Sequence, residues 1–235
     1  MAVMTKKSAL FLILFCLSAG LVQADVPTDT SGKIRWIQDR LDQASQPARR
    51  WQYGWTTVYG GMTYLYAAQA STLDETDEEH DRYDAVVNAS SSFLGFASMI
   101  LDPLSTVEAA GQLKQLPEST DEEKQIKRLK AESLLRSIAL REQRGRSWKA
   151  HVLAGLVSLA AGVAVACDDD RTGDGAAMFA GSMLVSEIQI FSQPVHASKA
   201  WDAYQNNGTE PISGNHTRRL FFSVLPRGIV LSYLF

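Results

Sequence analysis

Residues 146–194 read RSWKAHVLAGLVSLAAGVAVACDDDRTGDGAAMFAGSMLVSEIQIFSQP and contain two apolar segments rich in small residues. A short acidic turn with two glycines joins the segments. Each segment is about as long as a helix, and so short a connection places two helices antiparallel. The stretch therefore predicts a helical hairpin.

The same plan occurs about a hundred residues earlier, at residues 49–103. There RRW opens an aromatic segment, LDETDEEHD forms the turn, and a second apolar segment ends in Asp102-Pro103. An amphipathic helix is expected before each hairpin, at residues 33–45 before the first and at about residues 121–145 before the second. The repeated order indicates a tandem duplication.

We therefore predict a mainly α fold, a helical bundle at residues 25–205 made of two tandem copies. Copy one covers about residues 33–116 and copy two about residues 119–205, each with an amphipathic helix followed by a hairpin rich in small residues. Pro47 is expected to end the first amphipathic helix, because proline cannot donate the helical hydrogen bond.

Two local patterns refine the second copy. Ser119 or Thr120, with Glu122 or Glu123 three residues later, has the pattern of a capping box. Small residues recur every four positions along the next segment and would let a partner helix, through Ala177 and Gly181, approach closely: these residues are Ala150, Ala154, Ser158, Gly162 and Ala166. Such packing suits both a soluble core and a membrane.

The N-terminus indicates export. Lys6 and Lys7 precede a short apolar run, and Val22-Gln23-Ala24 resembles a cleavage site, so residues 1–24 are predicted to be a signal peptide. The formal net charge of the whole chain is −3, and the chain lacks a basic block, which excludes nucleic acid as an expected partner. Cys167 would be the single cysteine after cleavage, so no internal disulfide is expected.

Charge placement favours the exported side of the membrane over the inner membrane. If the apolar segments crossed the inner membrane after a cleaved signal, Arg49 and Arg50 would lie outside and the acidic turns inside. That order opposes the positive-inside tendency. We expect an exported protein in the periplasm or outer membrane of a Gram-negative bacterium.

The C-terminal residues 206–235 are predicted to be a linker followed by a β-hairpin. Its last strand places Ile229, Leu231, Tyr233 and Phe235 on one face. This pattern resembles the C-terminal β-signal of Gram-negative outer-membrane barrel proteins, which implies targeting to the outer membrane or its assembly machinery. No set of barrel strands precedes it, so a barrel would require several chains, as in a homo-oligomer.

A second hypothesis concerns the aromatic segment of the first hairpin. Trp51, Trp55, Tyr59 and Tyr66 alternate with three glycines, which suits either core packing or a surface that contacts lipid or a ligand. The alternative function is therefore a periplasmic carrier that binds a lipid or other apolar ligand between these rings and the second hairpin.

The sequence offers few catalytic candidates. His151 and Glu187 stand on otherwise apolar helices and could meet across the second hairpin, which would make a weak candidate for an enzyme site. Asp168, Asp170 and Asp174 are spaced like the start of a calcium loop, but the glutamate that such a loop needs is replaced by Phe179. No cofactor motif is present in the sequence. The leading expectation is a non-enzymatic envelope protein with a structural or assembly role.

Overall fold

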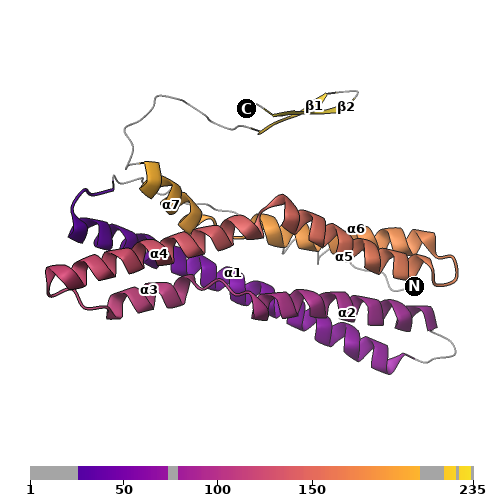
Figure 1. The fold of residues 1–235 in the computed structure, drawn as a ribbon. Coiled ribbons are helices and arrows are strands. Elements are labelled where there is room, and N and C mark those ends of the chain that lie inside the picture. Colours follow the sequence, from indigo (N-terminus) through magenta and orange to yellow (C-terminus); the bar gives the residue numbers. More distant parts are fainter. Residues whose placement is uncertain (1–25, 74–78, 207–219, 226–227, 234–235) are drawn as a thin grey trace.

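The helices of this chain form two parts that lie end to end in a computed structural model (Figure 1). The structure describes residues 26–73 and 79–206, and the backbone alone of residues 220–225 and 228–233. The helices are α1 (Thr30–Thr72), α2 (Glu79–Leu101), α3 (Thr106–Gln115), α4 (Asp121–Gly145), α5 (Trp148–Ala166), α6 (Thr172–Ser192) and α7 (His196–Asn206). The mainly α fold is confirmed.

Two short strands, β1 (Leu220–Leu225) and β2 (Gly228–Tyr233), follow the helices and pair antiparallel, with Leu220 opposite Tyr233. Their side chains lie outside the described residues, as do residues 1–25, 207–219 and Phe235. The signal peptide, the linker and the C-terminal hairpin with its targeting role therefore stay predictions.

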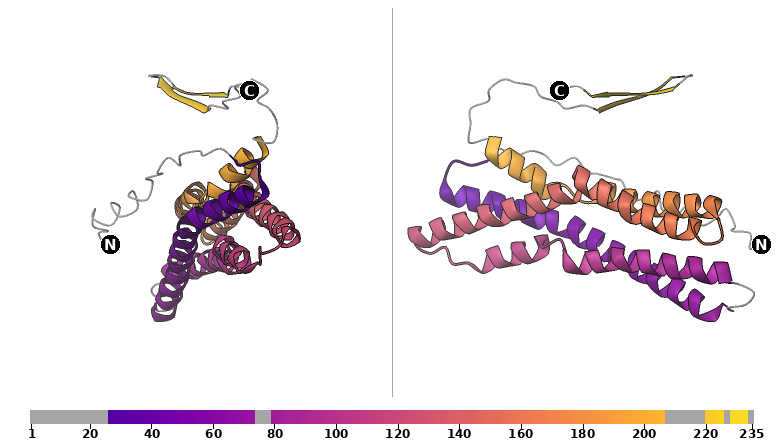
Figure 2. Two further views of the ribbon diagram at one scale, coloured as in Figure 1. Left: turned by 90° about the vertical axis from the view of Figure 1, so that its left-hand side faces the viewer. Right: turned by 45° about the vertical axis from the view of Figure 1, so that its right-hand side comes forward.

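One part, which we call the body, consists of residues 30–48 of α1 together with α3, α4 and α7. The other part, the arm, consists of two hairpins that extend from the body in the same direction (Figure 2). Residues 49–72 of α1 and the antiparallel helix α2 form the first hairpin. Helices α5 and α6 form the second.

The body has a core of large apolar side chains. Five large apolar side chains, contributed by α1, α3 and α4, are 0–1% exposed: Ile37, Leu41, Leu113, Leu135 and Ile138. Burying such a side chain stabilises a fold in water by about 1.5–3 kcal/mol. Alanines of α7 complete this cluster, so the body has the core of an ordinary water-soluble domain.

The predicted end of the first helix at Pro47 is wrong, because α1 continues through this residue. A proline inside a helix costs about 3 kcal/mol. Ala44 and Ala48 on either side of Pro47 are buried, and so is Trp51. Packing along one face therefore holds both halves in one helix, and α1 joins the body directly to the arm.

The start of α4 agrees with the sequence pattern. The Thr120 hydroxyl accepts a hydrogen bond from the Glu123 backbone N–H at 3.2 Å, and the Glu123 carboxylate accepts one from the Thr120 N–H at 3.1 Å. The capping box is thus confirmed with Thr120 as the cap. Helix order is similar in the two proposed copies, except that the first two helices of copy one are fused in α1; the duplication itself stays a prediction.

The helices of the second hairpin approach most closely at Gly162 and Gly175. A Cβ atom at Gly162 would lie 2.7 Å from the carbonyl oxygen of Gly175, so neither position has room for a side chain. Gly181, one of the expected contact residues, instead has open space beside it. A close approach in this hairpin was predicted, but the residue that contacts Gly162 is Gly175, which precedes both of the expected partners, Ala177 and Gly181.

Candidate functional site

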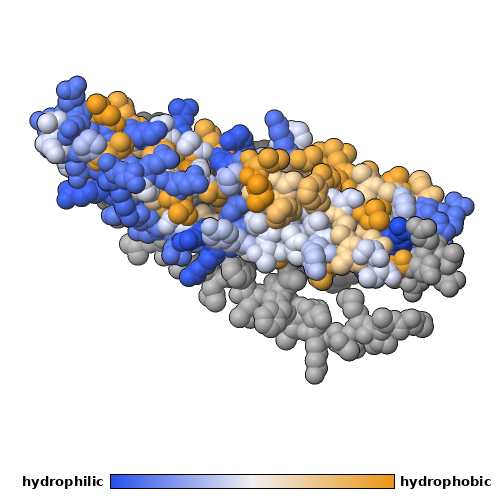
Figure 3. All heavy atoms as spheres, turned by 90° about the horizontal axis from the view of Figure 1, so that it is seen from below, coloured by the Kyte–Doolittle hydropathy of each residue, from blue (hydrophilic) through white to orange (hydrophobic). Residues whose placement is uncertain are grey.

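The outside of the arm is covered by large apolar side chains. On α5 alone, four such residues are between 48% and 59% exposed: Val152, Leu156, Leu159 and Val163. Similar residues are exposed on α2, among them Phe93 and Ile100. Figure 3 shows that hydrophobic residues gather over the arm and hydrophilic residues over the body. An apolar surface this extensive is unusual for a soluble monomer.

The inside of the arm contains small and polar residues. Ser92 of α2, Ser158 of α5 and Gly162 are buried between the helices, although their neighbours Phe93 and Leu159 are exposed. Large apolar residues outside and small or hydroxyl-bearing residues inside are typical of helices packed within a bilayer. The arm thus has the reverse arrangement of the body.

The lengths and compositions of the arm helices fit this arrangement. Within the described residues, three helical stretches are long and apolar enough to cross a membrane, and at most 22% of each apolar window is buried: Glu79–Gln115, Trp148–Ala166 and Thr172–Ser192. A helix of 20 residues is about 30 Å long, which matches the hydrocarbon core of a bilayer.

Charged side chains lie mainly at the two ends of the arm. Residues 51–72, 85–101 and 150–166 contain no Asp, Glu, Lys or Arg, and residues 175–192 contain only Glu187. The end next to the body has basic residues, among them Arg49, Arg50, Arg141, Arg144 and Lys149. The far end carries the acidic turn at residues 168–174. An uncharged interval between two charged ends is expected of a membrane-spanning bundle.

A cleft with a volume of about 900 Å³ lies between the two hairpins. Trp51, Tyr59 and Tyr66, three of the four aromatic ligand candidates, line it from α1. Small residues of the other helices, such as Gly95, Ala154 and Gly181, line the opposite walls. Drug-sized ligands bind in pockets of about 300–1,000 Å³, so the cleft has room for one.

At the body end, aromatic residues of α1 bind the last turns of α6. Trp55, the fourth candidate, donates its indole N–H to the Ser192 hydroxyl at 3.0 Å, and Trp51 donates to the same oxygen at 3.2 Å. The Tyr59 hydroxyl donates to the Gln189 side-chain oxygen at 2.9 Å. These bonds fix the two hairpins against each other beside the body.

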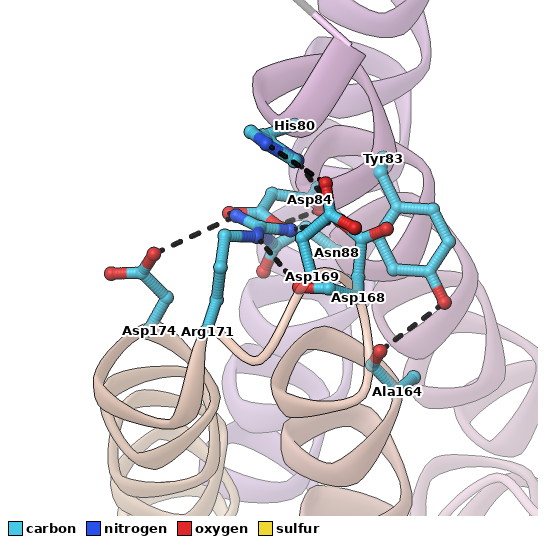
Figure 4. A network of polar contacts seen from close by, with 9 residues as sticks. All are labelled: His80, Tyr83, Asp84, Asn88, Ala164, Asp168, Asp169, Arg171 and Asp174. Carbon is cyan, nitrogen blue, oxygen red and sulfur yellow. Dashed lines mark hydrogen bonds and ion pairs between the residues drawn. The ribbon is translucent and has the colours of Figure 1, made fainter.

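At the far end, Arg171 binds the tip of α2 to the acidic turn, in a cluster that we call the clasp (Figure 4). Its guanidinium makes two bonds to the Asp84 carboxylate, at 2.8 and 3.1 Å, and one to Asp168 at 2.5 Å. His80 lies 3.2 Å from the same Asp168 carboxylate. The cleft is therefore bounded by polar contacts between the hairpins at both ends.

The aspartates proposed as calcium ligands take part in this clasp or its turn. Partial burial raises the pKa of Asp168, but hydrogen bonds from Arg171 and His80 outweigh it and hold the pKa below its usual value. Asp174 lies 3.6 Å from Arg171, and Asp170 has a left-handed backbone with φ of 57°. Among the described residues, no group of three or more His, Cys, Asp or Glu could hold a metal ion.

His151 and Glu187 meet across the second hairpin. The His151 Nδ1 atom lies 2.8 Å from one Glu187 carboxylate oxygen and 2.9 Å from the other, and the imidazole packs on Phe191 at 5.4 Å. Catalysis by this pair would also require an open pocket beside it, and neither residue lines the cleft. The pair links α5 to α6 and satisfies two polar groups within an apolar segment.

The sequence patterns did not point to the polar contacts between hairpins. Ser192 and Gln189 are ordinary polar residues in an apolar helix, and Arg171 is a lone cation in an acidic turn. The aromatic N–H and O–H groups needed partners once buried, which is the one signal that could have found the first two.

Comparisons of this chain with family models, with curated proteins and with solved structures find no match.

Proposed function

We propose that this chain is a non-enzymatic membrane protein of the cell envelope, anchored by the arm, with the body at the membrane surface. The observation that supports it best is the reversed arrangement of the arm, in which Leu156 and Leu159 are exposed and Ser158 is 1% exposed. In water, burying the leucines would be favourable. Hydrocarbon removes that preference, so the arrangement suits a bilayer.

The predicted signal peptide and C-terminal β-signal support placing this protein in the outer membrane, with a structural or assembly role. The basic end of the arm would then face the periplasm together with the body. This orientation does not conflict with the positive-inside tendency, because that tendency describes insertion from the cytoplasm. A chain that is exported first would insert from the periplasm.

A labelling experiment tests the membrane anchor. Leu156 in the arm is 59% exposed and Leu129 in the body is 57% exposed, so they form a matched pair. Each is replaced by cysteine in a chain with Cys16→Ser and Cys167→Ser and is treated with a water-soluble maleimide in liposomes. We expect the arm cysteine to react more than about tenfold more slowly, since lipid excludes water from it. Equal rates would show that the arm lies in water.

A second candidate function is the carrier of an apolar molecule. The specific observation in its favour is the cleft, which lies between the Trp51–Tyr66 face and the second hairpin, where this hypothesis requires a cavity. The two functions are compatible, because a cleft between membrane helices can take an apolar molecule directly from the bilayer.

A further inference from the structure

We propose that the cleft binds one anionic phospholipid, with an acyl chain between the hairpins and the phosphate at Arg144 and Lys149. This inference rests on the proposed membrane location, because the bilayer is the source of the lipid. It assigns to the cleft a single occupant with a defined orientation.

The shape of the cleft fits an acyl chain. Its lining runs along α1 from Trp51 to Tyr66, a distance of about 22 Å at the helical rise of 1.5 Å per residue. A lipid chain reaches only to the middle of the bilayer, which is about 15 Å of a 30 Å core. The cleft is therefore long enough to hold one chain along its axis.

The walls of the cleft also suit a chain more than a compact polar ligand. Small residues on α5 and α6 leave space opposite the rings of α1, as at Ala154 and Gly181. Ser158 lines the cleft, and its hydroxyl is buried without a hydrogen-bond partner in the described part of the chain. That hydroxyl lies nine residues beyond Lys149 on α5, about 14 Å along the helix, so a water beside it and not the lipid head group would satisfy it.

The charges at the open end give the lipid its orientation. Arg144 and Lys149 line the cleft next to the body, and both are exposed. Within the described residues neither makes an ion pair with a carboxylate, whereas the neighbouring Arg141 is paired with Asp102 at 2.7 Å. The opposite end carries the acidic turn. An anionic head group is therefore attracted to the end next to the body.

The test measures which lipid stays bound to the full chain after extraction from mixed liposomes. Phosphatidylglycerol and phosphatidylcholine are supplied in equal amounts, and native mass spectrometry counts the lipids retained per protein. We expect the wild type to retain one phosphatidylglycerol. In the variant R144Q/K149Q, the preference of the protein for phosphatidylglycerol over phosphatidylcholine should fall about thirtyfold, the size expected for the loss of two cations near a membrane surface.

Two further variants separate the site from general surface charge. R49Q/R50Q removes two exposed cations from the same end of the arm that do not line the cleft, and it should keep the preference. G181L adds a side chain where open space lies beside the glycine. This variant should retain neither phosphatidylglycerol nor phosphatidylcholine. Equal loss in R49Q/R50Q, an unchanged preference in R144Q/K149Q, or full retention in G181L would each overturn the site.

The labelling of Leu156→Cys is repeated in the same variants. If the cysteine at position 156 reacts slowly with the maleimide but the protein retains no specific lipid, the binding site is rejected and the proposed membrane anchor is still supported. A fast reaction in the wild type would reject both.

Discussion

The body and the arm consist of similar helices but differ in which side chains they expose. Leu135 and Ile138 are inside the body, whereas Leu156 and Leu159 are outside the arm and Ser158 is inside it. In water the hydrophobic effect determines which face is buried. In hydrocarbon that force is absent between helices, and close packing and hydrogen bonds replace it. Helices of one chain can thus be suited to different surroundings, water for the body and hydrocarbon for the arm.

The largest expected effect is on a leucine of the body. Leu135→Ala should lower the free energy of unfolding by about 3 kcal/mol, because it leaves a cavity in a packed core. Leu156→Ala in the arm should lower it by less than about 1 kcal/mol, because that side chain is 59% exposed and, in the proposed membrane location, would contact lipid or detergent. Thermal unfolding of the detergent-solubilised chain compares the two.

The outcome that would contradict the comparison is an equal loss in both variants. It would show that Leu156 is covered by protein, for example by a second copy of the chain, and that the arm is an ordinary core exposed only in the isolated chain.

The next effect concerns how the arm helices are held together. Gly162→Val would bring a side chain against the Gly175 backbone, and overpacking of this kind costs about 1–3 kcal/mol. Gly155→Val is the matched control, since a Cβ atom there meets nothing within 4 Å. We expect the first variant alone to lower the unfolding temperature. If both behave alike, close backbone contact does not stabilise the hairpin.

How much the sequence could predict also differs between the two parts. Hydrophobic periodicity and the capping box at Thr120 located the helices, because these are local signals. Pro47 misled because the packing of its buried neighbours against helices that lie far away in the sequence outweighs the local cost of a proline inside a helix. The contact of Gly162 with Gly175, in place of Gly181, depends on how two helices are rotated about their axes, and small residues on every face leave that rotation open.

The candidate site was predicted less well than the fold. Three of the four aromatic candidates line the cleft, since rings and glycines stand out in a helix, and their role in ligand binding stays a prediction. Arg144 and Lys149 were not singled out, because they belong to different helices and come together only where α4 meets α5. Pairing of His151 with Glu187 was anticipated, because two polar groups in an apolar hairpin need each other.

A smaller effect is expected at the clasp. Arg171→Gln removes the paired bonds to Asp84 and Asp168, so the tips of the two hairpins should separate more often. Electron spin resonance between labels on Cys167 and on a cysteine at Ser71 would show a broader distance distribution, with Cys16 replaced. Lys124→Gln, which removes an exposed ion pair in the body, should leave it unchanged. An unaltered distribution in Arg171→Gln would mean that the body alone fixes the hairpins.

The smallest effect is on pH dependence in the body. Glu142 is fully buried and accepts a hydrogen bond from the backbone N–H of Ser198 at 2.8 Å, at the start of α7. Burial raises its pKa, although the bonds from Ser198 and Ala197 oppose the shift. A raised pKa in the folded state means that the fold binds the proton more tightly than the unfolded chain. Glu142 therefore raises the free energy of unfolding as the pH falls, and this contribution is lost as the pH rises through the raised pKa.

Glu142→Gln cannot titrate, and its carbonyl can still accept the bond from Ser198. As the pH is lowered from about 8 to about 5, the free energy of unfolding of the wild type should rise relative to that of this variant. Denaturant unfolding of both chains at matched pH values measures the difference, in which the titration of all other groups cancels. A constant difference across this range would mean that the carboxyl keeps the same pKa in the folded and unfolded chains, and that the body tolerates a buried charge at the start of α7.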